Sequence, residues 1–199
     1  MNIKLVVLIS GNGSNLQAIL DACASNQLPA HVAAVISNKS DAFGLERARR
    51  SNVPAIVKTK SKNQDRSSYD TELADLAAAY QPDWIVLAGW MRLLSSSFLN
   101  RFPERVINLH PALPGTFPGI HAIERAWESY QRGEIDRTGV MVHLVPDEDV
   151  DAGPVLAQEI VAIQPEDTLE SLERRMHAVE HELLIKTLIS ITSHVSSNV

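Results

Sequence analysis

Residues 5–20, LVVLISGNGSNLQAIL, decide the fold. They begin with an uninterrupted apolar run from Leu5 to Ile9, which is typical of a parallel strand covered on both faces. A polar, glycine-rich segment ends the run, and Leu16, Ile19 and Leu20 follow at helical spacing. The stretch therefore predicts a strand that leads through a glycine-rich turn into a helix.

The same alternation of strand and helix continues along the chain. Apolar runs predict further strands at 32–36, 55–57, 84–88, 106–109, 139–145 and 155–163. Helical patterns lie at 43–50, 68–80, 97–101 and 122–132, and a long last helix begins at Leu169. This order is typical of an α/β protein with a doubly wound, mostly parallel sheet and helices on both faces. Such sheets bind ligands beyond the carboxyl ends of their strands.

Length and composition fit one domain. The chain has 199 residues without a repeat or linker, so we expect a single domain over 1–199 with a polar, frayed tail after about residue 194. The net charge of −6 argues against nucleic acid as a partner. The first apolar run is far shorter than the roughly 20 residues of a membrane helix, and Cys23 is the only cysteine. We therefore expect a cytoplasmic protein that binds no membrane.

The glycine-rich turn after the first strand is a candidate anion site. Gly11 and Gly13 let the backbone approach an anion, and Ser14 and Asn15 add donors at the start of the helix, whose N-terminus favours negative charge. The dinucleotide fingerprint is incomplete because its third glycine position holds Leu16, and no Walker lysine follows. A turn with a Ser or Asn cap and no ligand remains the alternative.

Two polar residues end the strand at 106–109. Asn108 and His110 stand at i and i+2, so their side chains point to the same side. An amide beside an imidazole suits the stabilisation of an oxyanion with the histidine as proton donor. The alternative is that both side chains only cap backbone groups at the end of the strand.

The acidic turn at 147–154, between the last two strands, offers a partner for this histidine. Its D-x-D-x-D spacing is reminiscent of a calcium loop, but Ala152 and Gln158 occupy the sixth and twelfth positions, which excludes that reading. Most of its charges are explained by a solvated turn. A carboxylate of this turn placed against His110 would raise the pKa of the imidazole.

The last helix carries a pattern typical of a zinc site. His177, Glu180 and His181 match the H-x-x-E-H arrangement of one metalloprotease class, with both histidines on one helical face. No third ligand stands at a telling spacing, so we expect no metal. Lone histidines such as His143 are interpreted as surface or structural residues.

Five segments, in this order, resemble one known family: residues 6–18, 37–39, 87–95, 107–111 and 151–154. The set is similar to the folate-dependent formyltransferases, and within them to the phosphoribosylglycinamide formyltransferases of purine synthesis. The resemblance implies a Rossmann-like formyltransferase fold. It implies transfer of a formyl group from the co-substrate 10-formyltetrahydrofolate to the glycinamide amine of 5′-phosphoribosylglycinamide, with these small molecules as partners and no metal. It leaves monomer and homodimer open.

The resemblance also implies roles for single residues. Asn108 and protonated His110 would stabilise the oxyanion, while Asp151 keeps His110 protonated and helps to carry the proton to the leaving nitrogen. Glu180 would face the substrate amine. The phosphate would be bound by Gly13, Ser14 and Asn15. The cofactor would be bound by Arg66, Met91, Arg92, Leu93, Leu94, Asn108, Asp147 and Val150.

The sequence departs from the family pattern at two places, and two other functions stay open. The loop at 112–119 differs in sequence, and the segment from His143 to Asp151 is one residue longer than usual. A formyltetrahydrofolate hydrolase and a non-catalytic nucleotide-binding module stay as alternatives. Methionyl-tRNA formyltransferase would need a further tRNA-binding domain, for which 199 residues and the negative charge leave no room.

Overall fold

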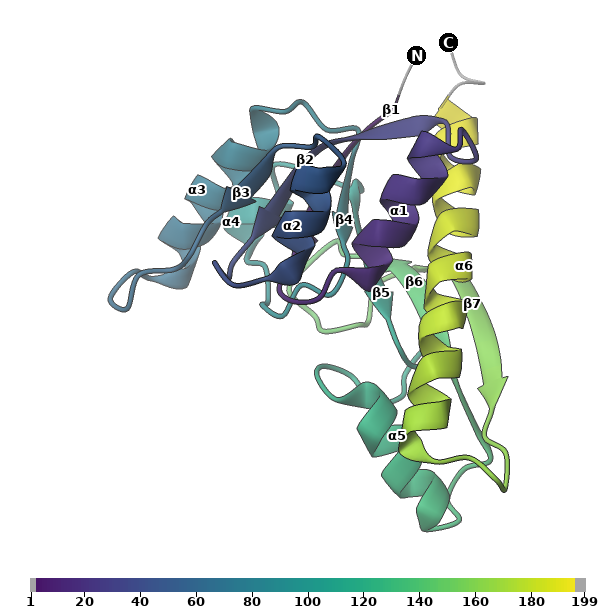
Figure 1. Ribbon diagram of the computed structural model, residues 1–199. Coiled ribbons are helices and arrows are strands. Elements are labelled where there is room, and N and C mark those ends of the chain that lie inside the picture. Colours follow the sequence, from purple (N-terminus) through teal and green to yellow (C-terminus); the bar gives the residue numbers. More distant parts are fainter. Residues whose placement is uncertain (1–2, 196–199) are drawn as a thin grey trace.

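A computed structural model describes residues 3–195, so residues 196–199, the last part of the predicted frayed tail, lie outside the described residues. One seven-stranded sheet has the order β3-β2-β1-β4-β5-β6-β7 (Figure 1). Pairing is parallel from β3 through β5 and antiparallel between β5, β6 and β7. The elements are β1 (Ile3–Ile9), α1 (Ser14–Ala24), β2 (Ala30–Ser37), α2 (Phe43–Arg50), β3 (Ala55–Val57), α3 (Arg66–Ala78), β4 (Trp84–Leu87), α4 (Ser96–Leu99), β5 (Val106–His110), α5 (Ala122–Gln131), β6 (Arg137–Leu144), β7 (Val155–Ala162) and α6 (Leu169–Val195).

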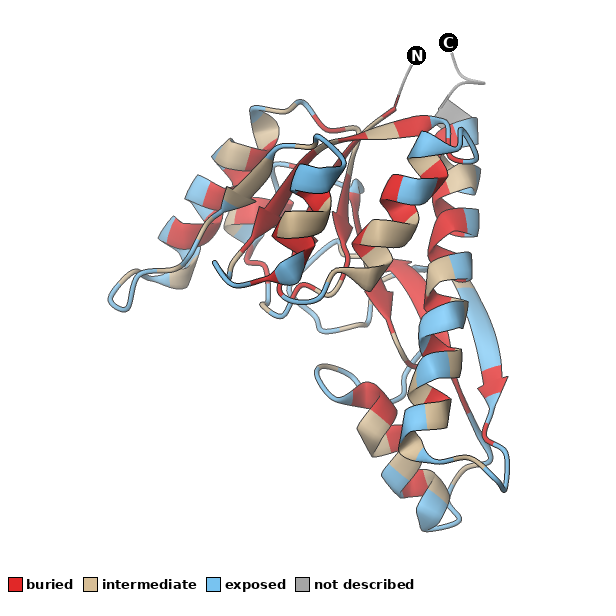
Figure 2. Cartoon of the chain, viewed as in Figure 1, coloured by how far each residue is buried: buried red, intermediate tan, exposed pale blue. Residues whose placement is uncertain are grey.

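Strand β1 contributes to two cores, one on each face of the sheet. Leu5, Val7 and Ile9 pack in the core that contains residues of α1, α5 and α6. Val6 and Leu8 point to the opposite face and pack in the core with α3 and α4. Because side chains alternate across a strand, cover on both faces requires the continuous apolar run seen in the sequence. The predicted doubly wound sheet is therefore present, with β1 and β4 buried while β7 is largely exposed (Figure 2).

The observed ends of the elements differ from the predicted ones by a few residues. Helix α3 begins at Arg66, two residues earlier than predicted, because the Asp65 side chain caps it by accepting a hydrogen bond from the Ser68 N–H. Strand β5 extends to His110, where it pairs with Met141 of β6. His110 therefore belongs to the strand and is fixed by its ladder.

The change of direction in strand order lies between β1 and β4. Leu8 pairs with Leu87, and Leu87 pairs with Asn108, so the strands β1, β4 and β5 end at the same edge of the sheet. The Ser10 N–H donates to the Gly89 carbonyl (3.1 Å) and the Ser10 hydroxyl accepts from the Met91 N–H (2.8 Å). The loops after these strands are thereby joined at the place where open α/β sheets bind ligands. None of the described helices is long and apolar enough to cross a membrane.

Candidate active site

A cleft opens at the carboxyl ends of β4 and β5. Its cavity volume is about 250 Å³. One wall comes from the loop after β4, another from the loops that follow β5, and the acidic turn between β6 and β7 forms a third. Its lining residues fall within 87–94, 108–111, 119–122 and 143–151.

Asn108, His110 and Asp151 meet on one side of this cleft. The Asn108 Nδ2 donates to Asp151 Oδ1 at 3.0 Å, and His110 Nδ1 lies 3.2 Å from Asp151 Oδ2. The Gly119 N–H donates to the same Oδ2 at 2.8 Å. Asp151 therefore joins the end of β5 to the loop that precedes α5, and the three residues that the sequence singled out are in contact.

The backbone around Asp151 is held in an unusual conformation. Asp151 has φ of 52°, a left-handed value that costs energy for a residue with a side chain. Two residues later the chain passes so close to β6 that a Cβ on Gly153 would collide with the Leu144 carbonyl oxygen. The Leu144 N–H then donates to the Pro154 carbonyl at 2.9 Å. Gly153 is thus the residue that lets the turn return to the sheet with the Asp151 carboxylate aimed inward.

A fourth residue, His143, belongs to the same network and was missed by the sequence interpretation. It lies opposite Asn108 in the antiparallel pairing of β5 with β6. His143 Nδ1 is 2.8 Å from the Leu144 carbonyl, and Nε2 is 3.2 Å from Asn108 Nδ2 and 3.4 Å from Asp151 Oδ1. Since Nδ1 faces a carbonyl, the neutral ring carries its proton there and Nε2 accepts from the Asn108 amide. The only sequence signal was its strand position, because the pairing with Asn108 cannot be seen without the sheet.

Asp151 raises the pKa of His110 as the sequence predicted, but burial of the ring outweighs this effect. Burial lowers this pKa, and although the Asp151 charge and the Phe117 carbonyl, 3.1 Å from Nε2, act in the opposite direction, the net pKa lies below its ordinary value. The side chain is only 4% exposed, which accounts for the strong desolvation. Burial raises the pKa of Asp151, but its contacts with His143, the hydrogen bond from the Gly119 N–H and the neighbouring His110 bring it below its ordinary value.

The candidate anion site at residues 11–15, the glycine loop, lies next to the middle of α6. Helix α1 begins at Ser14, and Gly13 precedes it in a left-handed conformation with φ of 77° and no side-chain cap. Asn15 Nδ2 is 3.5 Å from Glu180 Oε2, which also lies 2.7 Å from His177 Nδ1. Glu180 is 4% exposed, so the glycine loop and α6 are joined by a buried carboxylate.

The pair of histidines that is typical of a zinc site is engaged in another way. Glu180 raises the pKa of His177 through their hydrogen bond, whereas burial lowers the pKa of His181. Within residues 3–195, no group of three or more His, Cys, Asp or Glu side chains is arranged to hold a metal ion.

The comparison with known proteins decides the family. The formyl transferase family profile matches residues 3–188. The chain belongs to the formyl transferase family. It is 46% identical to the phosphoribosylglycinamide formyltransferase of Dictyostelium discoideum over 94% of this chain and 97% of that protein. It is 43% identical to the enzyme of that name from Escherichia coli, over 90% of this chain and 82% of the relative.

Solved structures confirm the predicted fold of this formyl transferase. The glycinamide ribonucleotide transformylase 1 of Geobacillus kaustophilus superposes with a TM-score of 0.89 at 40% identity, covering 96% of this chain and 99% of the other. The transformylase 1 of Symbiobacterium toebii gives 0.88 at 42% identity, covering 94% and 86%. The resemblance that the sequence motifs carried is thereby confirmed.

The residues that the resemblance implied for the cofactor fall into two groups. Most line the cleft: Met91, Arg92, Leu93, Leu94, Asn108, Asp147 and Val150. Met91 and Leu93 are 60% and 52% exposed, so two large apolar side chains are available to a flat ligand in this formyl transferase. Arg92 lies over the Tyr69 ring, with its guanidinium carbon 5.0 Å from the ring centroid. Their cofactor role stays a prediction.

Arg66 is not among the residues that line the cleft. Its Nη2 donates to the Leu94 carbonyl at 2.9 Å and to Glu148 Oε2 at 2.7 Å. The other oxygen of Glu148 accepts from the Ser96 N–H at 2.8 Å, and this hydrogen bond is the main cause that lowers the pKa of Glu148. In this formyl transferase, Arg66 holds the acidic turn against the start of α4. A cofactor carboxylate that binds Arg66 would have to compete with Glu148 for it.

The loop that departs from the family pattern contacts His110 directly. The Phe117 carbonyl faces His110 Nε2 and also accepts from Arg125 Nη2 at 2.6 Å. The same Arg125 nitrogen donates to the Pro118 carbonyl at 2.7 Å. Helix α5 of this formyl transferase thus fixes the carbonyl that completes the surroundings of His110.

Proposed function

We propose that this cleft transfers the formyl group of 10-formyltetrahydrofolate to the glycinamide amine of 5′-phosphoribosylglycinamide, a step of purine biosynthesis. The relatives at 46% and 43% identity carry the name of that activity. The single observation that carries the proposal is the contact of Asn108, His110 and Asp151 on one side of the cleft. We propose that the protein acts in the cytoplasm, that a single domain carries out the reaction, and that its partners are small molecules.

The chemistry follows from these side chains. The amine nitrogen attacks the formyl carbon, and the carbonyl electron pair moves to oxygen to give a tetrahedral oxyanion. Asn108 and His110 donate hydrogen bonds to that oxyanion, and one well-placed donor is typically worth about 3–4 kcal/mol. When the intermediate collapses, the bond between the formyl carbon and N10 breaks. The proton lost by the amine reaches N10 by way of the His110–Asp151 pair.

Two features of the resting site have consequences for this reaction. Both Asn108 amide hydrogens are directed at Asp151 and His143, so Asn108 has to exchange one of these hydrogen bonds for the oxyanion. Burial lowers the pKa of His110, whereas an oxyanion formed beside it favours the imidazolium. The proton affinity of His110 therefore rises as the intermediate forms, which is when a proton donor is useful.

The substrates are assigned to the two ends of the site. Gly13, Ser14 and Asn15 bind the substrate phosphate at the start of α1, where free N–H groups favour an anion. Glu180 faces the amine, supported by its position next to Asn15. The folate lies along the apolar wall between Met91 and Leu94, against the acidic turn.

An assay with the folate donor, with and without the phosphorylated amine, tests the proposal. We expect deformylation of the donor only when the amine is present, with one formylated amine per donor consumed. Turnover that is equally fast without the amine would mean a hydrolase, and no turnover in either condition would mean a binding module. His110→Ala should abolish turnover while the ribonucleotide still binds.

A further inference from the structure

Helix α2 is packed directly on the glycine loop. The Gly44 N–H donates to the Gly11 carbonyl at 3.1 Å. A Cβ on Gly13 would lie 2.7 Å from the Gly44 Cα, and a Cβ on Gly44 would collide with Ile9. Both glycines are needed for this close approach, so the loop and the first turn of α2 form one packed unit.

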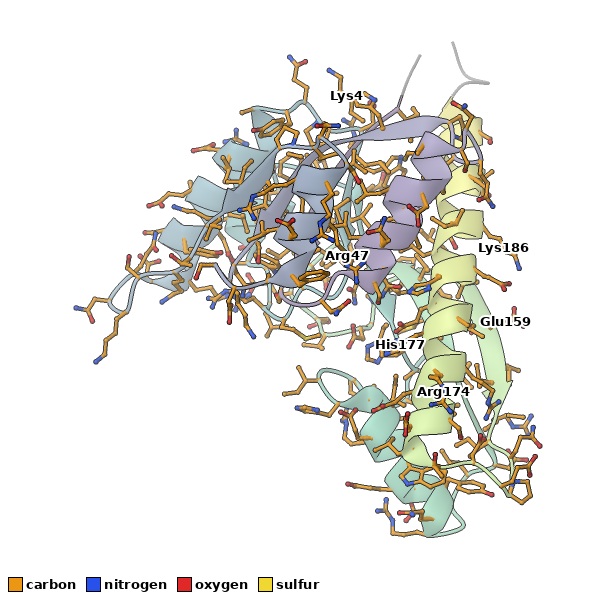
Figure 3. All side chains as sticks on the ribbon, viewed as in Figure 1. Lys4, Arg47, Glu159, Arg174, His177 and Lys186 are labelled. Atoms are coloured by element: carbon orange, nitrogen blue, oxygen red, sulfur yellow. The ribbon has the colours of Figure 1, made fainter. Side chains whose placement is uncertain are left out.

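Arg47 extends this contact by one turn of α2. Its Nε donates to the Asn12 carbonyl at 2.9 Å, and its Nη2 donates to the Asn12 side-chain oxygen at 2.9 Å. Its Nη1 donates to the Gln17 side-chain oxygen at 3.2 Å. Figure 3 shows Arg47 between α2 and the start of α1. The planar guanidinium thereby links α2 to both sides of Gly13 and Ser14.

We propose that Arg47 is a positioning residue for the phosphate subsite. The inference rests on the proposed function, which assigns the phosphate to Gly13, Ser14 and Asn15. Arg47 holds the Asn12 carbonyl toward α2 and so fixes the orientation of the peptide planes that follow. The N–H groups of the loop then face outward. Its fixed positive charge next to the loop adds to the attraction for a phosphate dianion.

The fork geometry, and not only the charge, is what this role requires. Arginine donates along two directions to the backbone and side-chain oxygens of Asn12, whereas lysine is a single point charge. Lysine at this position would keep the field but lose the fixed orientation of the loop. Arg47→Lys and Arg47→Ala therefore separate orientation from electrostatics.

Arg50 offers a matched control on the same helix. It pairs with Glu46 (2.8 Å) and lies over the Phe43 ring, which Arg47 also contacts. These contacts of Arg50 stay within α2 and do not reach the glycine loop. Arg50→Ala therefore removes the same charge from α2 without touching the loop.

Steady-state kinetics with both substrates, and competitive inhibition by inorganic phosphate, test the inference. We expect Arg47→Ala to raise the KM for the phosphorylated amine about tenfold, the loss typical of one charge-assisted hydrogen bond. The inhibition constant of phosphate should rise by a similar factor. Arg47→Lys should recover only part of the loss, while kcat, the KM for the folate donor and all values for Arg50→Ala stay within about twofold.

An unchanged KM for the amine in Arg47→Ala, or an equal rise in Arg50→Ala, would overturn the inference. Gly13→Ala distinguishes a failure of the inference about Arg47 from a failure of the proposed function. If Gly13→Ala raises the amine KM and Arg47→Ala does not, the loop binds phosphate without help from Arg47. If neither does, the phosphate subsite itself is misplaced. Thermal unfolding of Arg47→Ala, Arg47→Lys and Gly13→Ala, each compared with the parent, shows whether these variants remain folded.

Discussion

His143 lies directly across from Asn108 in the ladder between β5 and β6, with its Nε2 3.2 Å from the Asn108 amide nitrogen. The ring is fixed in turn by the Leu144 carbonyl, which faces Nδ1 at 2.8 Å. A backbone carbonyl thus sets the tautomer of His143, and His143 sets the orientation of the Asn108 amide. The order of these contacts predicts that His143 positions the Asn108 amide, which we propose as a donor to the oxyanion.

Replacing His143 should therefore lower kcat more than it changes binding. We expect His143→Ala to reduce kcat about 10- to 100-fold because the Asn108 amide loses the acceptor that orients it. Both KM values should change less than about threefold, since His143 is not assigned to either substrate. Steady-state kinetics with both substrates measure this split.

The conservative variant provides the control for His143. Glutamine has a side-chain oxygen that can accept from the Asn108 amide, so His143→Gln should recover part of the lost kcat. A variant with both KM values raised and kcat unchanged would show that His143 shapes the binding site and does not orient the donor.

Asp151→Asn removes the charge that favours protonation of His110. We expect kcat to fall at least about 100-fold, because the proton path from the amine to N10 loses one of its two members. The pKa of His110, which burial already lowers, should fall further without the carboxylate. Nuclear magnetic resonance titration of the His110 ring measures this shift, and an unchanged or higher pKa would contradict the electrostatic role of Asp151.

Two histidines should change the stability in opposite directions as pH is varied. Burial holds the folded-state pKa of His110 below the ordinary value of 6.5, so in the window below 6.5 the unfolded chain binds more protons and stability falls as pH falls. Glu180 holds the folded-state pKa of His177 above 6.5, so its contribution is complete at lower pH and is lost as pH rises above 6.5.

Glutamine substitutions at both positions check these signs. His110→Gln should flatten the decline of the unfolding free energy below pH 6.5, and His177→Gln should flatten the decline above pH 6.5. Denaturant unfolding between about pH 5 and 8 gives the two slopes. The same change of slope in both variants would refute the opposite pKa directions assigned to His110 and His177.

The sheet could be predicted from the sequence because the apolar pattern that marks each strand lies within that strand. The unbroken apolar run of β1 predicts cover on both faces, and two cores share its side chains. Asn108 and His110 were found because their spacing is local to one strand. Asp151 lies far away along the chain, so its contact with them came from the family resemblance and not from any local pattern.

The rest of the site depends on contacts between elements. The role of His143 requires knowledge that β6 runs antiparallel to β5 in one particular register. The upward effect of the Asp151 charge on the pKa of His110 could be predicted from sequence, whereas the burial that outweighs it could not. Arg47 was not noticed because its partners lie 35 and 30 positions earlier along the chain.

Gly153→Ala should damage the site through the backbone. A Cβ at this position would collide with the Leu144 carbonyl oxygen, which belongs to β6 and cannot move aside without breaking the sheet pairing. We expect a loss of about 1–3 kcal/mol in unfolding free energy, and a large loss of kcat since Asp151 is displaced. Denaturant unfolding and the transfer assay measure the two effects.

Gly133→Ala is the matched control for this substitution. It has φ of 72° but nothing within 4 Å of an added Cβ, so it should cost only about 1–2 kcal/mol of left-handed strain and leave kcat unchanged. A Gly153→Ala variant with full activity would show that the turn does not fix the Asp151 carboxylate.

Glu148 connects the acidic turn to α3 and α4, and its removal should weaken binding of the folate donor. Arg66 and the Ser96 N–H each hold one of its carboxylate oxygens, at 2.7 and 2.8 Å. Glu148→Gln keeps the size of the side chain but loses the charge of both contacts. Because the turn forms one wall of the cleft, we expect the KM for the donor to rise about three- to tenfold with kcat nearly unchanged.

The neighbouring Asp149→Asn variant separates this anchoring from the general charge of the turn. Asp149 lies in the same turn, and its N–H donates to Asp147 within that turn and not to α3 or α4. Asp149 also lines the cleft. If anchoring by Glu148 is what matters, Asp149→Asn leaves the donor KM within about twofold, whereas an equal rise in both variants would mean that the charge of the turn itself binds the donor. A fall in the donor KM of Glu148→Gln would reverse the interpretation, because it would mean that Glu148 competes with a donor carboxylate for Arg66. The salt dependence of the donor KM distinguishes anchoring by Glu148 from competition by Glu148. Screening weakens the exposed Glu148–Arg66 pair, so anchoring predicts that added salt raises the donor KM of the parent toward that of Glu148→Gln.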